Sequence, residues 1–343
     1  MCSPLRFQTL RVFGWAVLAI ITQLFVGMGW AQSTFGSYVG TVKDPTGGVV
    51  AGCKITVKNT GTAAERTATT DQTGSYVLVN IEPGNYEITM EAPGFQKAQF
   101  TQLVLTARQT VRIDGNLKLA TQTEAVNVSV AAEAPINTEV SNIAETKLGR
   151  ELIDLPVALG SRANGSTSAF STLTTQPGVE VDNNGQISVA GSQVDMLSVS
   201  VDGISTMSPR NSAPIGELFP SFDGIAEIRV SEVNNTAEFG GISDVTTVSR
   251  SGSNQFHGGV FENHQNSAFA ARDTFSSKVP KLIMNDFGAF VGGPLSVPKL
   301  YNGHDKTFFF MTYEGLRLPG QKVLVESVPS LALRGGDLSV YPG

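Results

Sequence analysis

The sequence predicts a mainly β chain built from a β-sandwich, a small α+β domain and a group of aromatic strands. Short alternating strands separated by turn residues run from Gly36 to about Ala120, a spacing typical of a sandwich. Residues 137–253 mix helix signals with hairpin signals. Nine of the nineteen phenylalanines fall between Phe256 and Phe310, where glycines and aromatics alternate. These three sequence patterns indicate three structural parts.

The composition is low in charge and indicates an exported β-rich protein. Only 16% of the 343 residues are charged and 36 are glycine, whereas average chains carry roughly 25% charged residues. The net charge is −6 and the sequence has no basic stripe, which argues against nucleic acid as a partner.

Residues 1–31 have the pattern of a secretory signal peptide. Arg6 and Arg11 precede an apolar stretch, and small residues before Gln32 suit cleavage after Ala31. The alternative, an uncleaved membrane helix, requires about 20 apolar residues. Cleavage would remove Cys2 and two positive charges, so the mature charge becomes −6 − 2 = −8. Cys53 then has no internal disulfide partner, and we expect it to be a small buried apolar side chain.

The stretch 36–120 contains about seven expected strands, each with one apolar face. Turn signals such as Asp44-Pro45, Asp71–Gly74 and Pro83-Gly84 separate them. The residues expected to face the core are Cys53, Ile55, Val57, Tyr86, Ile88, Met90, Val111, Ile113, Leu117 and Leu119.

Residues 137–253 predict short helices at 149–155, ended by Pro156, and at 170–175, ended by Pro177-Gly178. Asn184-Gly185, between 179–181 and 187–189, is a strong hairpin signal, and Asp202-Gly203 follows 197–201 in the same way. Further strands are expected around Ile228 and Val230 and around Val245 and Val248.

Between these parts, residues 121–136 form a linker that contains an alternating segment. Val126, Val128 and Val130 alternate with Asn127 and Ser129. From the local sequence, the alternation favours one more strand followed by a linker, because alternation is the commonest strand signal. The alternative is an extended peptide that adds to the sheet edge of another protein.

Residues 254–343 include three strand-length aromatic stretches, "FHGGVFENH", "NDFGAFVGGPL" and "KTFFFMTYEGLR". In a membrane barrel, one face of each strand meets lipid and aromatics gather at the interfaces. A soluble sheet with a phenylalanine-rich core has a similar pattern, so the alternation alone leaves both open.

No motif in the sequence indicates catalysis, a metal or a cofactor, and we predict that the chain is not an enzyme. His257 and His264 differ by seven positions, so on one strand they would point to opposite faces, and His304 lies in an expected loop. Nucleophile-elbow, zincin and phosphate-loop motifs are absent. Asp182-x-Asn184-Gly185 lacks the downstream Glu of a calcium loop and suits a hairpin better.

The first part resembles the carboxypeptidase regulatory-like domain. The residues that carry this are "GTVKDPTGGVVAGCKITVKNTGT" and "TTDQTGSYVLVNIEPGNYEITMEAPGF". The resemblance implies a transthyretin-like β-sandwich over 36–120 that acts as an accessory module without peptidase activity.

The order of the parts resembles Oar-like TonB-dependent outer-membrane receptors. The most specific stretch is "NTAEFGGISDVTTVSRSGSNQFHGGVFENHQNSAFAARDTF", joined by "QPGVEV", "VSVDGIS" and the aromatic strands. The resemblance implies that 137–253 is an α+β plug domain and that 254–343 holds the first strands of an outer-membrane β-barrel. It also implies that the alternating segment is a TonB box made of Glu124, Ala125, Val126, Asn127, Val128, Ser129 and Val130.

For function, the resemblance implies energy-coupled uptake of a ligand. The implied partners are a TonB energy-transducing protein, outer-membrane lipid and an unknown extracellular ligand. The sandwich and plug would lie on the periplasmic side of the outer membrane. Two features depart from the family pattern. "LPVALGSRANGS" loosens a compact plug element, and a barrel of about 22 strands needs more chain, so we expect an N-terminal, truncated part that is not transport-competent alone.

Two other classes of function are weighed against this one. The chain could be a secreted or surface carbohydrate-binding-like sandwich module, which a natural stop after the sequence would favour. It could also be an accessory part of a metallopeptidase, which would require a zinc-peptidase domain that the sequence lacks.

Overall fold

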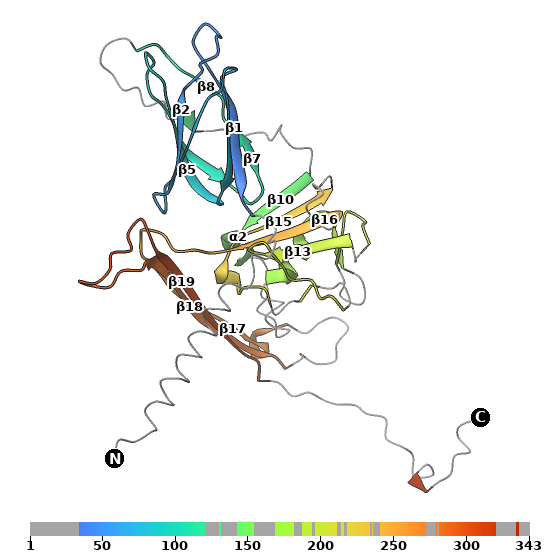
Figure 1. The fold of residues 1–343 in the computed structure, drawn as a ribbon. Helices are drawn as coiled ribbons and strands as arrows, with labels where there is room; N and C mark the ends of the chain where they lie inside the picture. Colours follow the sequence, from blue (N-terminus) through green and yellow to red (C-terminus); the bar gives the residue numbers. More distant parts are fainter. Residues whose placement is uncertain are drawn as a thin grey trace, which may run out of the picture.

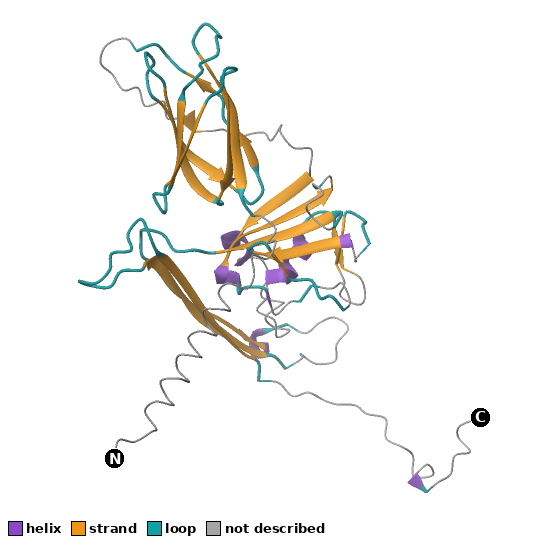
Figure 2. Cartoon of the chain, viewed as in Figure 1, coloured by secondary structure: helices purple, strands orange, loops and turns teal. Residues whose placement is uncertain are grey.

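Three β-rich units follow one another along the chain (Figures 1 and 2). The computed structural model describes residues 34–120, 130–131, 143–153, 169–181, 187–193, 196–210, 214–215, 218–233, 235, 241–271, 279, 281–319 and 334–335. The predicted signal peptide at 1–31 and the whole of the unusual stretch 155–166 lie outside these residues. Among the described helices, none has the length and apolar character needed to cross a membrane.

The first unit is the expected sandwich of two sheets. One sheet has the order β4-β1-β7, and β8 also pairs with β1; the other has the order β3-β2-β5-β6-β9. The strand bounds are β1 Gly36–Lys43, β2 Lys54–Asn59, β3 Glu65–Thr69, β4 Ser75–Ile81, β5 Gly84–Glu91, β6 Ala98–Leu105, β7 Thr110–Arg112, β8 Gly115–Asn116 and β9 Val130–Ala131.

The core of the sandwich contains nearly all the residues expected there. Cys53, Ile55 and Ile88 are fully buried, and Cys53 is a free thiol inside this core, as predicted. The expectation for Leu119 is wrong, because its side chain is 59% exposed. Leu119 lies beyond β8 and makes only an isolated bridge with Phe95, so the second sheet does not cover it.

The second unit is a five-stranded mixed sheet of order β10-β15-β16-β13-β14, with a short hairpin and small helices around it. Its core includes Leu152, Phe222 and Ile228. The bounds are β10 Ile143–Leu148, α2 Gly149–Ile153, η1 Ala169–Thr175, β11 Val179–Val181, β12 Ile187–Val189, β13 Leu197–Val201, β14 Ile204–Ser205, η4 Phe222–Gly224, β15 Ile225–Val233 and β16 Ser243–Ser249.

Both predicted hairpins of this unit are confirmed. β11 and β12 pair antiparallel, although their connection at 182–186 lies outside the described residues. β13 and β14 pair antiparallel through Asp202 and Gly203, whose φ angles of 50° and 81° are both positive. Two positive φ angles are what a tight two-residue hairpin requires. The helix expected at 170–175 is present in the 3-10 form.

The third unit is a three-stranded antiparallel sheet of order β17-β18-β19. Its strands are β17 His257–Asn266, β18 Ile283–Pro294 and β19 Phe308–Arg317, and the short helix η5 Ser267–Phe269 follows β17. These are the three aromatic stretches singled out in the sequence.

Two aspartates hold equivalent turns in the sandwich. Asp44 Oδ1 accepts hydrogen bonds from Thr46 N, Thr46 Oγ1 and Gly48 N at 2.7–2.8 Å. Asp71 Oδ1 accepts from Thr73 N, Thr73 Oγ1 and Ser75 N at 2.7–2.9 Å. The pKa of each carboxyl is lowered, mainly by the threonine hydroxyl. These bonds are made to the ionised form, so they link stability to pH.

We predict that acid destabilises the sandwich through these two turns. A carboxyl whose folded pKa is depressed contributes stability that is present above its unfolded pKa of 3.8 and is lost as the pH falls through the folded pKa. The melting temperature of the segment Gly36–Ala120, measured by circular dichroism, should therefore fall below about pH 4. The D44N/D71N variant, which keeps an acceptor oxygen, should show a smaller fall. An equal fall in both proteins would remove the two turns as the cause.

Candidate functional site

The outer face of the three-stranded sheet is an exposed apolar surface. On β17–β19 the residues of alternate positions share a face, and register aligns Val260 with Ala289 and Tyr313, and Val291 with Met311. Val260 is 86% exposed and Met311 is 66% exposed. A contiguous apolar surface of this kind usually marks a contact with lipid or with another protein.

Aromatic rings border this outer face at both ends. Phe256 contacts Phe309 edge-on at 6.4 Å between ring centroids, and at the other end Phe287 lies 6.5 Å from Tyr313. From Phe309 to Gly315 the strand rises roughly 20 Å at about 3.4 Å per residue. The apolar band of membrane barrels is about 25 Å tall and is flanked by aromatic girdles. The dimensions and the borders of the face therefore suit a bilayer.

A row of polar side chains beyond Phe287 and Tyr313 ends the apolar face. His264, Asn285 and Arg317 are aligned in register, and His264 Nδ1 lies 2.7 Å from Asn285 Oδ1. The Arg317 guanidinium lies over the Phe287 ring at 5.9 Å. Charged and amide groups at this level would meet water or lipid headgroups.

The inner face of the same sheet pairs rings with glycines. A Cβ added to Gly259 would lie 2.9 Å from the Phe290 ring, and one added to Gly292 would lie 2.9 Å from the Phe310 ring. His257 stacks on Phe310 at 6.1 Å. The glycines are therefore required where a cross-strand ring lies flat over the backbone. His257 and His264 lie on opposite faces, as predicted.

This inner face packs against the α+β domain. The Arg250 guanidinium, just after β16, lies 5.6 Å from the centroid of the Phe290 ring. A Cβ built on Gly224 of η4 would lie 3.4 Å from Thr312 Cγ2, so the two units are in close contact there. Asp286, fully buried on the inner face, accepts a hydrogen bond from Asn263 Nδ2 at 3.0 Å. The sheet thus has a packed inner face and an apolar outer face.

The segment Glu124–Val130 lies almost entirely outside the described residues. Val130, its last residue, belongs to β9, which pairs in parallel with β6 through Phe100↔Val130 and Thr101↔Ala131. This edge of the sandwich accepts the chain as an added strand. The assignment of Glu124, Ala125, Val126, Asn127, Val128 and Ser129 stays a prediction.

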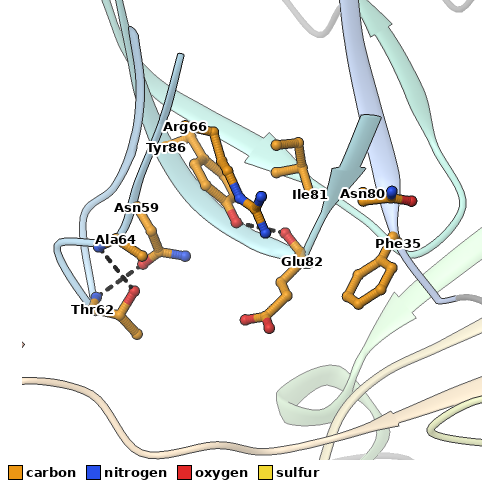
Figure 3. A pocket seen from close by; sticks show the side chains of 9 residues that line it. All are labelled: Phe35, Asn59, Thr62, Ala64, Arg66, Asn80, Ile81, Glu82 and Tyr86. Carbon is orange, nitrogen blue, oxygen red and sulfur yellow. Dashed lines mark hydrogen bonds between the residues drawn. The ribbon is translucent and has the colours of Figure 1, made fainter. Parts of the chain in front are cut away.

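One end of the sandwich contains a polar hollow of about 510 Å³ (Figure 3). Tyr86 donates a hydrogen bond to the Glu82 carbonyl at 2.6 Å, and burial raises the pKa of its hydroxyl. Asn59 Oδ1 accepts from Gly61 N and Thr62 N. The lining residues are Phe35, Asn59, Thr62, Ala64, Arg66, Asn80, Ile81, Glu82 and Tyr86. Open, mixed polar walls of this kind suit weak binding of a polar ligand.

A buried polar contact joins the sandwich to the α+β domain. Glu227, Arg229 and Asp244 are each at least 95% buried on one face of β15 and β16. Glu227 Oε1 accepts from Ala107 N, Arg229 donates to the Ala107 carbonyl at 2.9 Å, and Arg108 pairs with Asp244. Burial raises the pKa of the Glu227 and Asp244 carboxyls and lowers the pKa of the Arg229 guanidinium.

This contact is not predicted from the sequence, although a signal for it is present. In "IAEIRVSEV", Ile228 and Val230 predict a strand, and the alternate residues Glu227, Arg229 and Ser231 form its polar face. A strand with charges on one face and aliphatic residues on the other is usually half exposed. Here the second face is covered by another domain, which a single sequence does not reveal.

The described residues contain no group of three or more His, Cys, Asp or Glu side chains placed to hold a metal ion.

Two family descriptions match the chain and define its class. The carboxypeptidase regulatory-like domain matches residues 38–119, and an outer membrane β-barrel domain matches residues 248–343. The chain is therefore an outer-membrane protein with an N-terminal transthyretin-like sandwich.

A more particular relationship comes from a curated relative. The chain is 27% identical over 314 residues to the TonB-dependent transporter Oar of Myxococcus xanthus. The match covers 86% of this chain and 28% of that protein, so the chain spans about a quarter of the relative's length. The resemblance to Oar-like TonB-dependent outer-membrane receptors is confirmed.

Solved structures give only a partial likeness. Hydroxyquinol 1,2-dioxygenase from Pseudomonas putida covers 27% of this chain and 59% of its own, with 10% identity and a TM-score of 0.22. Catechol 1,2-dioxygenase from Acinetobacter covers 30% and 60%, with 11% identity and a TM-score of 0.23. At these TM-scores nothing about function follows.

We predict that the outer face makes the chain dependent on detergent. Without detergent, the chain from Gln32 to Gly343 should elute from size-exclusion chromatography as aggregate, and Gln32–Arg250 should stay soluble, because an exposed apolar sheet associates with other chains. The V260K/M311K variant should shift toward smaller species. E262K, which places a lysine on the same strand and face at a position that is already charged, should not. A compact monomer from the unsubstituted chain would contradict a lipid-facing sheet.

Proposed function

We propose that this chain is the N-terminal part of an energy-coupled outer-membrane receptor. In this proposal, residues 137–253 act as the plug, and β17–β19 are the first strands of the barrel that surrounds it. The observation that carries the proposal is the two-faced sheet, whose outer face is apolar with aromatic borders and whose inner face packs on the α+β domain. A barrel wall around a plug needs both of these faces.

The proposed activity is uptake of an extracellular ligand without covalent chemistry. The intact receptor would bind its ligand from outside and admit it when the plug is displaced. A three-stranded sheet leaves backbone edges that lipid cannot satisfy, so this part would require the remaining strands for transport. The sandwich and plug would face the periplasm.

The proposed energy input reaches the chain through Glu124–Val130. The alternation of valines with small polar residues suits an extended strand, and strand addition uses main-chain hydrogen bonds that any strand can offer. Val130 already lies in the strand β9, which supports an extended backbone at this end of the segment. The partner would be the periplasmic domain of a TonB energy-transducing protein.

A second candidate function rests on the hollow at the end of the sandwich. Arg66, Glu82 and the rings of Phe35 and Tyr86 surround it, and a sugar is recognised by such polar groups together with rings (Figure 3). A secreted carbohydrate-binding module would use this hollow alone and would leave the apolar outer face of β17–β19 without a purpose. The receptor accounts for this outer face, and we therefore favour it.

We predict that Val128→Pro weakens binding to a TonB periplasmic domain. Proline removes one backbone donor and restricts φ in the middle of the added strand. In isothermal titration, a peptide spanning Thr121–Ala134 with Val128→Pro should bind at least about tenfold more weakly, since a lost hydrogen bond and strain together exceed 1.4 kcal/mol. Thr123→Pro, one residue outside the segment, is the matched control. Equal binding by the V128P and unsubstituted peptides would make the segment a linker only.

A further inference from the structure

We infer that the α+β domain carries a built docking socket for the turn Thr106–Gln109, and that this contact locks the sandwich and the α+β domain into one unit. The socket consists of Glu227, Arg229 and Asp244.

Hydrogen bonds within the turn itself hold its conformation. Gln109 N donates to the Thr106 carbonyl at 3.2 Å, and the Gln109 side chain accepts from Thr106 N and Oγ1 at 3.1 and 3.0 Å. Arg108 has a φ of 58°, a conformation that non-glycine residues seldom adopt. The turn thus presents the N–H and the C=O of Ala107 and the Arg108 side chain toward β15 and β16.

The socket recognises both the backbone and the charge of the turn. Glu227 and Arg229 lie two positions apart on β15. Glu227 accepts from the Ala107 N–H and Arg229 donates to the Ala107 C=O, and Ala107 is fully buried. Asp244 on β16 takes the Arg108 guanidinium and also accepts from Thr246 Oγ1 at 2.7 Å. A residue that is bound through both its N–H and its C=O, beside a paired cation, fits the socket in one register and one orientation.

Charge balance makes the docked state selective for a cation at position 108. The socket alone has two carboxylates and one guanidinium, a net charge of −1, and Arg108 brings the sum to zero. These groups are almost completely buried. A buried charge without a partner is strongly unfavourable, so loss of Arg108 should open the contact.

If Glu124–Val130 is pulled as in the proposed function, on which this step rests, the contact would transmit that force to the α+β domain. The segment 121–142 follows Ala120 of the sandwich, adds β9 to the edge of the sandwich sheet at Val130–Ala131, and leads into β10, an edge strand of the α+β sheet that pairs with β15. With the socket closed, both ends of 121–142 are attached to one unit. A pulling force on Glu124–Val130 would then act on β15 and β16 through the sandwich, in addition to acting on β10.

The test is hydrogen exchange measured by mass spectrometry on the chain from Gln32 to Gly343 in detergent. Arg108→Asn removes the charge, and asparagine tolerates the positive φ. Exchange should rise roughly tenfold or more in peptides covering 103–109, because the Ala107 N–H loses its acceptor Glu227 and becomes exposed when the contact opens. The matched control is Arg112→Asn, whose side chain pairs with Asp114 at the surface, and its exchange in these peptides should not change.

Asp244→Asn is the second arm, because it leaves the sandwich sequence unaltered. It should raise exchange at 103–109 as Arg108→Asn does, and the double variant should add little to either single change. Retained protection of 54–59 and 84–91 shows that the sandwich is still folded. If exchange at 103–109 is unchanged in Asp244→Asn, or if Arg108→Asn behaves as Arg112→Asn does, the lock is refuted. The measurement uses no TonB protein, so its outcome is independent of the peptide-binding test.

Discussion

The structure of this chain depends on one constraint, which is that successive side chains of a β-strand point to opposite faces of its sheet. Every sheet therefore has two faces whose surroundings must match. In the sandwich, the two inner faces cover each other around Cys53, Ile55 and Ile88. In the α+β domain, one face holds the apolar core of Ile228 and Val230, and the other is polar. In β17–β19, the inner face packs and the outer face is apolar and exposed.

The two unusual faces account for how the units fit together. The polar face of β15 and β16 is buried, so its charges need partners, and the turn Ala107–Arg108 supplies a backbone donor, a backbone acceptor and a cation. The outer face of β17–β19 is apolar, so it needs a surrounding without water. The first requirement is met inside the chain. The second requirement would be met in the outer membrane, and residues 248–343 match an outer membrane β-barrel domain.

Local patterns of the sequence were sufficient for most of the elements. The strands at 179–181 and 187–189 and the turn at Asp202-Gly203 followed from alternation and from residues that tolerate positive φ. Leu119 was placed in the core wrongly, because alternation continues past β8 while the covering sheet does not. The partners of Glu227 and Asp244 lie more than a hundred positions away along the chain. Local sequence patterns do not predict contacts at such a separation. Residues 124–129 were proposed from resemblance, and the described structure does not include them.

The most direct test of the two-faced sheet is a nitroxide scan along β19, from Phe309 to Glu314, on the chain from Gln32 to Gly343 in detergent micelles. With Cys53 replaced by alanine, each position in turn carries one spin label, and its accessibility to oxygen is compared with its accessibility to a water-soluble nickel complex. Oxygen is concentrated in apolar surroundings, so labels at 309, 311 and 313 should favour oxygen, and labels at 310, 312 and 314 should be protected from both reagents, with a period of two. Accessibility that does not alternate, or that favours the nickel complex at 311 and 313, would contradict a lipid-facing outer face.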